Sequence, residues 1–228
     1  MDESPGHRDE GPGHRDESRD RSERAPTKAA YRVQRLEAFS DGVFAIAITL
    51  LVLEIGVPEG SSDDLWAAVL DQWPSYLAYL ISFATVGALW IGHNAMTELL
   101  DHADLLLVRY NLLLLLLVSF LPFPTRLLAE YVREGDAERV AVTIYGVVLL
   151  LTSAVLSLTW RHATTSGLVR ADADTDRVAD VGRRLTPGLT GYAIALALGQ
   201  VRPLAAVITY ALIAVFLILP TRRHRPRR

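Results

Sequence analysis

The chain has 228 residues, and 50% of them are hydrophobic while 21% are charged, so long apolar runs must alternate with concentrated charge. This pattern is typical of an integral membrane protein. The absence of cysteine excludes disulfides and thiolate chemistry, and a formal net charge of -3 does not support a nucleic-acid partner.

Residues 1–28 are predicted to form a disordered, charged tail. The segment GHRDE occurs twice in it, and residues 2–24 contain no aliphatic or aromatic side chain. Such a segment cannot bury enough apolar surface to fold. It also lacks the apolar run of a secretory signal.

Residues 35–55 predict the first transmembrane helix. The segment opens with polar side chains and then runs through residues 42–53, where Thr49 is the only polar side chain. At about 1.5 Å per residue the segment spans about 31 Å, which matches the hydrocarbon core of a bilayer. A carboxylate near the bilayer centre costs about 2.5 to 3.5 kcal/mol on insertion scales. Asp41 is therefore expected to have a partner or a water-filled site, and it is a functional candidate.

Five more apolar stretches follow an acidic loop at 56–73. They predict spans at 74–96, 105–128 (interrupted by Pro122 and Pro124), 140–160, 185–201 and 203–220. The resulting fold class is an all-α, six-span integral membrane protein, with a membrane domain at 29–220 and a basic tail at 221–228. Lys and Arg gather before the first span, between the fourth and fifth spans, and in the last tail. The positive-inside rule then places both termini in the cytoplasm.

Three polar side chains should lie at a similar depth in the membrane. Asp41, His93 and Asn111 all fall near the cytoplasmic ends of their spans, so a shared hydrogen-bond network is expected. A structural network is favoured over proton coupling, which stays open. Arg35 and Phe39, one turn apart, have the spacing for a cation–ring contact.

Several other motifs have simpler explanations. Thr85, Val86 and Gly87 resemble part of a selectivity filter, but they lie within an apolar span without the residues that should follow. A hydrolase triad of Ser40, His93 and Asp41 lacks a nucleophile turn. No metal-ligand spacing is present either. We therefore expect neither an enzyme nor a bound cofactor.

The first span has two different faces. On an ideal helix one face carries Phe39, Gly42, Val43, Ile46, Thr49, Leu50 and Leu53, and Asp41 projects roughly opposite to Ile46. From the residues alone, contact with lipid or with other helices is the simplest interpretation of this face.

The first span also carries a family resemblance. Arg35, Phe39, Ser40 and Asp41 form an R-x-x-x-F-S-D signature directly before the apolar helix. This signature resembles that of the endosomal and lysosomal potassium channel family, the transmembrane protein 175 family, in its single-repeat prokaryotic form. The likeness continues through WIGHN at 90–94 and through 111–125, and it does not cover the tails.

The resemblance implies a potassium-permeable channel in a bacterial or archaeal cell membrane. In the family four subunits assemble, the first helix of each lines a central pore, and potassium permeates passively. The partners implied are further copies of the chain in a homotetramer, the lipid bilayer and potassium ions. Carried over residue by residue, Ile46 matches the gate isoleucine, Leu50 and Leu53 match further constriction rings, and Thr49 matches the hydroxyl ring beside the gate.

Two alternatives belong to other functional classes. A proton-coupled secondary transporter would use Asp41 and His93, since ionisable groups inside a membrane are its ordinary signature. No second FSD motif suggests the inverted repeat that many transporters have. An intramembrane enzyme is the weaker alternative.

Overall fold

The computed structural model describes residues 32–56 and 64–219. The expectations for the tails at 1–28 and 221–228, and for residues 57–63 of the acidic loop, lie outside these residues. Within them, four helical segments are long and apolar enough to cross a membrane: Val33–Glu54, Trp73–Thr97, Leu105–Tyr131 and Asp136–Thr165. These four segments confirm the prediction of an all-α membrane protein.

The first two of these segments carry the signature and the WIGHN motif. Helix α1 (Val33–Leu50) continues into the 3₁₀ turn η1 (Leu51–Glu54), and a short helix α2 (Leu65–Asp71) precedes α3 (Trp73–Thr97). The acidic sequence at 56–73 predicts a loop here, so α2 is a difference from that prediction. The side chain of Asp64 caps α2 by accepting a hydrogen bond from the Ala67 backbone N–H.

The third span is divided as its prolines predict. Helix α4 (Leu105–Phe120) ends just before α5 (Pro122–Tyr131), because Pro122 has no N–H to continue the ladder and suits the first turn of a new helix. Helix α6 (Asp136–Thr165) follows a turn at Gly135, whose positive φ of 56° favours glycine.

The last two helices differ in character. Helix α7 (Thr175–Gly199) begins ten residues before the predicted span at 185–201, and α8 (Pro203–Ile218) is short and apolar. The early part of α7 is charged, and it is supported by ion pairs of Arg183 and Arg184 with Asp180 and of Arg177 with Glu98. The apolar run in the sequence predicted the membrane-spanning part of α7 but not the residue at which the helix begins.

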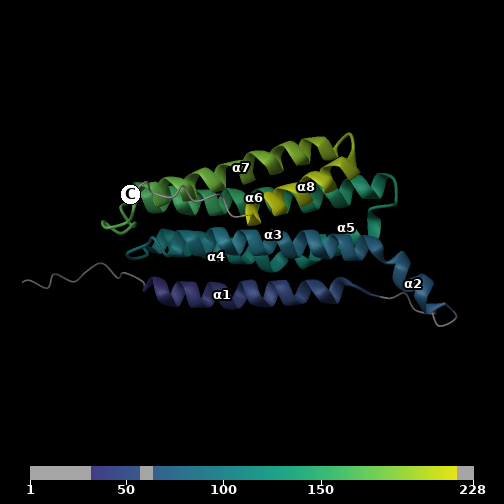
Figure 1. The fold of residues 1–228 in the computed structure, drawn as a ribbon, viewed down its shortest axis with the longest axis horizontal. Coiled ribbons are helices and arrows are strands. Elements are labelled where there is room, and N and C mark those ends of the chain that lie inside the picture. Colours follow the sequence, from purple (N-terminus) through teal and green to yellow (C-terminus); the bar gives the residue numbers. More distant parts are fainter. Residues whose placement is uncertain (1–31, 57–63, 220–228) are drawn as a thin grey trace, which may run out of the picture. The chain divides into compact units, whose positions relative to one another are not determined.

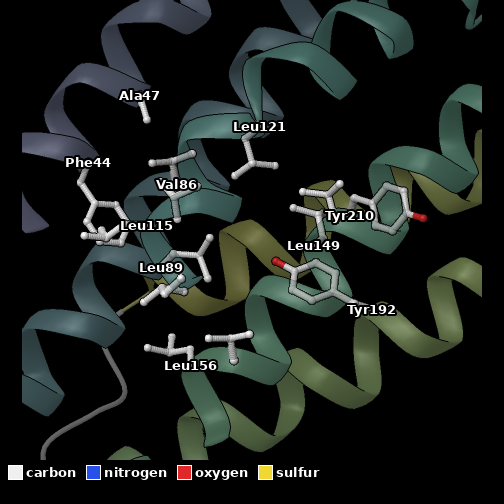
Figure 2. Packing of buried hydrophobic residues seen from close by; sticks show 14 of the residues in the cluster. Phe44, Ala47, Val86, Leu89, Leu115, Leu121, Leu149, Leu156, Tyr192 and Tyr210 are labelled. Carbon is white, nitrogen blue, oxygen red and sulfur yellow. The ribbon is translucent and has the colours of Figure 1, made fainter. Parts of the chain in front are cut away.

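Helix α1 lies beside α3 and α4, which in turn pack against α5, α6 and α8 (Figure 1). The buried side chains form one continuous cluster. Phe44, Ala47 and Leu51 join it from α1, and residues such as Leu115, Leu149 and Tyr210 extend it to the other helices (Figure 2). Helix α1 therefore contacts the rest of the chain along one side only.

A small polar cluster ties the α3–α4 loop to the end of α6. Leu100 and Val169 form an isolated antiparallel β-bridge, and Nε2–H of His162 donates to Oδ2 of Asp104 over 2.8 Å. Asp104 also caps α4 by accepting from the Leu107 N–H. Partial burial raises the pKa of Asp104, but the hydrogen bonds from Leu107 and His162 lower it by more, so its pKa lies below the ordinary value.

We expect the Asp104→Asn variant to lose stability in a pH-dependent way. A carboxyl group whose pKa is depressed by folding stabilises the protein above its unfolded pKa of about 3.9, and this contribution is lost as the pH falls through the folded value. Asparagine keeps a capping oxygen but not the charge. The difference in thermal unfolding midpoint between wild type and variant in detergent should therefore be larger at neutral pH than at about pH 3. An equal difference at both pH values would contradict this role.

Candidate functional site

One side of α1 and η1 is exposed although it is apolar. Phe39 is 56% exposed, Ile46 61%, Leu50 40% and Leu53 72%, and Thr49 is exposed among them. These are the side chains that the sequence placed on one face. Within the described part of the chain nothing covers this face, which we call the open face of α1.

The opposite side of α1 is packed tightly against the rest of the chain. Ser40, Phe44, Ala47 and Leu51 are each at most 1% exposed. They recur at spacings of four, three and four residues, which is one helical stripe, and α1 contacts α3 and α4. The packed stripe fixes the rotation of α1 about its axis and so determines which residues form the open face.

The helix tightens where the open face ends. Residues Leu51–Glu54 form a 3₁₀ turn, in which successive side chains advance about 120° instead of 100°. Leu53 still projects from the exposed side, but its direction does not follow from an ideal α-helix. One turn earlier, the Thr49 hydroxyl donates to the Ile46 carbonyl over 2.8 Å. The lone pairs of Thr49 Oγ1 stay available to a cation.

A directed chain of hydrogen bonds anchors the packed side of α1. Nε2–H of His93 donates to Oδ1 of Asn111 (2.8 Å), and Nδ2–H of Asn111 donates to Ser40 Oγ (3.0 Å). The Ser40 hydroxyl in turn donates to the Leu36 carbonyl (2.8 Å). Ser40, His93 and Asn111 are each at most 1% exposed, and the Phe44 ring lies 5.6 Å from that of His93. We call this chain the Ser40–Asn111–His93 network.

Asp41 has a different partner from the one expected. Its Oδ1 accepts a 2.8 Å hydrogen bond from Nε1–H of Trp90, a residue that the sequence analysis did not connect with it. Trp90 and His93 are three residues apart on α3, so they lie on one face. That spacing was the available signal, because Asp41 bonds to Trp90 directly while Ser40, the residue before it, reaches His93 through Asn111 of α4.

Arg35 is exposed at the start of the helix. Among residues 32–56 and 64–219, no cation–ring contact joins it to Phe39, so the proposed stacking is not formed; the one such contact there pairs Arg133 with Trp73. Thr85 and Val86 are buried within α3, and the Thr85 hydroxyl bonds to the Ile81 carbonyl. These residues have helical geometry and not that of a filter loop.

The arrangement provides an apolar face with a hydroxyl group, not a reaction centre. In the residues that the structure describes, no group of three or more His, Cys, Asp or Glu side chains is placed to hold a metal ion. Behind the face, Ser40, Asn111 and His93 are joined by hydrogen bonds and Asp41 bonds to Trp90, which suits these groups to hold α1 in position.

Comparison with known proteins points to one family. Residues 35–122 match the family described as endosomal/lysosomal potassium channel TMEM175. A potassium channel of Chamaesiphon minutus is 42% identical over 81% of this chain and 93% of its own length. A potassium channel of Streptomyces collinus is 39% identical over 80% of this chain and 89% of its own length.

A solved structure shows the same fold. The crystal structure of a lysosomal potassium-selective channel TMEM175 homologue from Chamaesiphon minutus superposes with a TM-score of 0.74. The two chains are 39% identical, and the match covers 81% of this chain and 95% of the other.

Proposed function

The chain belongs to the endosomal/lysosomal potassium channel TMEM175 family, and from this premise we propose that it forms a potassium-permeable channel whose pore is lined by the open face of α1. The observation that carries this proposal is the exposure of an apolar stripe with one hydroxyl residue. Lipid would also cover apolar side chains, but the packed stripe and the polar network determine which side of α1 is open, and that side carries Ile46 and Thr49.

Several copies must meet for such a pore to exist, because one helix cannot surround an ion. We infer a homotetramer with four α1 helices around a central axis, as the family resemblance implies. Two features support this assembly. Helix α1 is packed on one side only, and 22% of its apolar window is buried, compared with 56% for α6.

The constriction would be an apolar ring beside a hydroxyl ring. Four Ile46 side chains on the axis gate by dewetting, because a hydrated ion crosses an apolar ring only when water fills it. Thr49 lies one turn further on, with its hydroxyl proton donated to the Ile46 carbonyl. Its oxygen lone pairs then offer partial replacement of an ion's hydration shell. Leu50 and Leu53 extend the apolar lining.

The topology proposed from sequence has six spans, with α7 and α8 as the fifth and sixth. Helix α8 has 16 residues, or about 24 Å, which a local thinning of the bilayer accommodates. We propose a cell-membrane location with both termini cytoplasmic, because Lys and Arg gather before α1, between α6 and α7, and after α8. We also propose that the channel domain extends from residue 29 to residue 220.

The transporter alternative relied on Asp41 and His93 acting together. In the structure Asp41 binds Trp90 and His93 binds Asn111, so each has its own partner. Recording from purified protein in planar bilayers separates the two functions. Step-like unitary currents carried by potassium are expected, whereas a saturable, proton-linked flux without unitary steps would overturn the proposal.

A further inference from the structure

A short helix lies just outside the second membrane-spanning segment. Helix α2 ends at Asp71, two residues before the segment Trp73–Thr97, which is long and apolar enough to cross a membrane. At about 1.5 Å per residue α2 extends only about 10 Å, so it stays near the level at which the headgroups of a bilayer begin. Figure 1 shows α2 at the end of the helical bundle and inclined to α3.

The two sides of α2 differ in chemistry. Asp71 lies on one side, together with the small residue Ala67. At about 100° per residue, the large apolar side chains fall within an arc of about 140° on the other side: Leu65, Trp66, Val69 and Leu70. We call these four residues the apolar face of α2. Trp66 is 78% exposed and Leu70 is 69% exposed, although a surface helix usually turns such a stripe toward the core.

Contacts with the rest of the chain fix the orientation of α2. Oδ1 of Asp71 accepts a 3.1 Å hydrogen bond from Nη1–H of Arg133, in the turn between α5 and α6. The same guanidinium group lies 4.9 Å from the centre of the Trp73 ring. The Tyr76 hydroxyl donates to the Val69 carbonyl over 2.9 Å. The polar side of α2 is therefore held against the protein, and Trp66 is left to project outward.

The apolar face adjoins exposed apolar side chains of the span itself. In the first turns of α3, Trp73 is 42% exposed, Leu77 37% and Leu80 60%. Tryptophan is enriched where a membrane meets water, because its ring is apolar and its N–H is polar. Residues 56–73 contain no Lys or Arg, so the segment itself has no cation for an anionic headgroup. These features fit contact with lipid through apolar surface and not through charge.

We propose that the apolar face of α2 inserts into the headgroup region of the bilayer and holds this end of the second span at the membrane surface. In amphipathic helices of this kind the apolar side is buried about 5 to 10 Å, at the boundary between headgroups and acyl chains. The partner is a lipid surface of either headgroup charge. The proposal uses the membrane location of the chain and does not depend on ion conduction.

Spin labels on the full chain test the insertion, because the chain has no native cysteine to react with the label. Trp66→Cys and Leu70→Cys place the label on the apolar face, and Ala67→Cys places it at an exposed position on the opposite side. In phosphatidylcholine liposomes, labels at residues 66 and 70 should collide more with oxygen, which concentrates in lipid, than with a water-soluble nickel complex. The label at residue 67 should show the reverse. Phosphatidylglycerol liposomes should give the same pattern.

Three results would overturn the proposal. Equal access of the nickel complex to all three labels would place the apolar face in water. Exclusion of both probes at residues 66 and 70, with spin–spin broadening that disappears on dilution with unlabelled protein, would mean that a second copy of the chain covers this face. Nickel exclusion only in phosphatidylglycerol would mean attraction by charge. A wild-type thermal unfolding midpoint in each labelled variant verifies that the fold is kept.

Discussion

Ile46→Asn is expected to raise the unitary conductance severalfold and to let sodium compete better with potassium. Ile46 is 61% exposed on the open face, so in the proposed tetramer four of these side chains meet on the axis. An amide in place of the alkyl group holds water, and a constriction that stays wet no longer excludes hydrated ions. Unitary conductance and the bi-ionic reversal potential measure the two effects.

Neighbouring positions give the matched controls. Val43→Asn changes a partly buried residue that packs against the core, so its effect on permeation should be smaller. Thr49→Val removes the hydroxyl oxygen but keeps the shape, so it should lower the preference for potassium while the apolar gate remains. Wild-type conductance and selectivity in an intact Ile46→Asn tetramer would show that α1 does not form the constriction there.

Asn111→Leu should destabilise the subunit by about 2 to 4 kcal/mol, because one substitution removes two hydrogen bonds and leaves the buried His93 Nε2–H without an acceptor. His93 Nδ1 already has no hydrogen-bond partner in the described residues, so the imidazole would be wholly unsatisfied. Thermal unfolding in detergent should show a lower midpoint, and size-exclusion chromatography in detergent should show loss of the proposed tetramer.

A double variant distinguishes the network from simple packing. When both partners become apolar, the penalty for an unpaired group disappears, so His93→Leu together with Asn111→Leu should recover part of the lost stability. Leu112→Ala, at a half-exposed position on the same helix, should cost far less. Additive losses in the double variant would mean that the hydrogen bonds contribute little.

The long helices were predictable because membrane spans are set by apolar length. The break at Pro122 was also predictable from the sequence, because proline lacks the N–H that would continue the helical hydrogen bonds. Helix α2 was missed because its seven residues lie within an acidic segment, where no long apolar run marks a helix. The start of α7 was missed because ion pairs and the Asp174 cap, not apolar residues, support its first turns.

The site was predictable in part. Residue periodicity separated Ile46 and Thr49 from the packed stripe, and depth in the membrane grouped His93 with Asn111. Depth does not determine rotation about a helix axis, however, so it could not show that Asp41 turns toward Trp90 while Ser40 turns toward Asn111. Only the packing of three helices fixes those pairings.

The chain contains no cysteine, so a single introduced cysteine reports whether water reaches its position without any reaction at a native thiol. Silver ions should block the current through Ile46→Cys channels, because silver reacts with thiols that water reaches. They should spare Phe44→Cys, on the packed side of α1, and Ile208→Cys, on the exposed side of α8. Block at Ile46 alone is the result that a pore lined by the open face of α1 predicts. Currents that persist in Ile46→Cys, with block at Ile208→Cys instead, would contradict it.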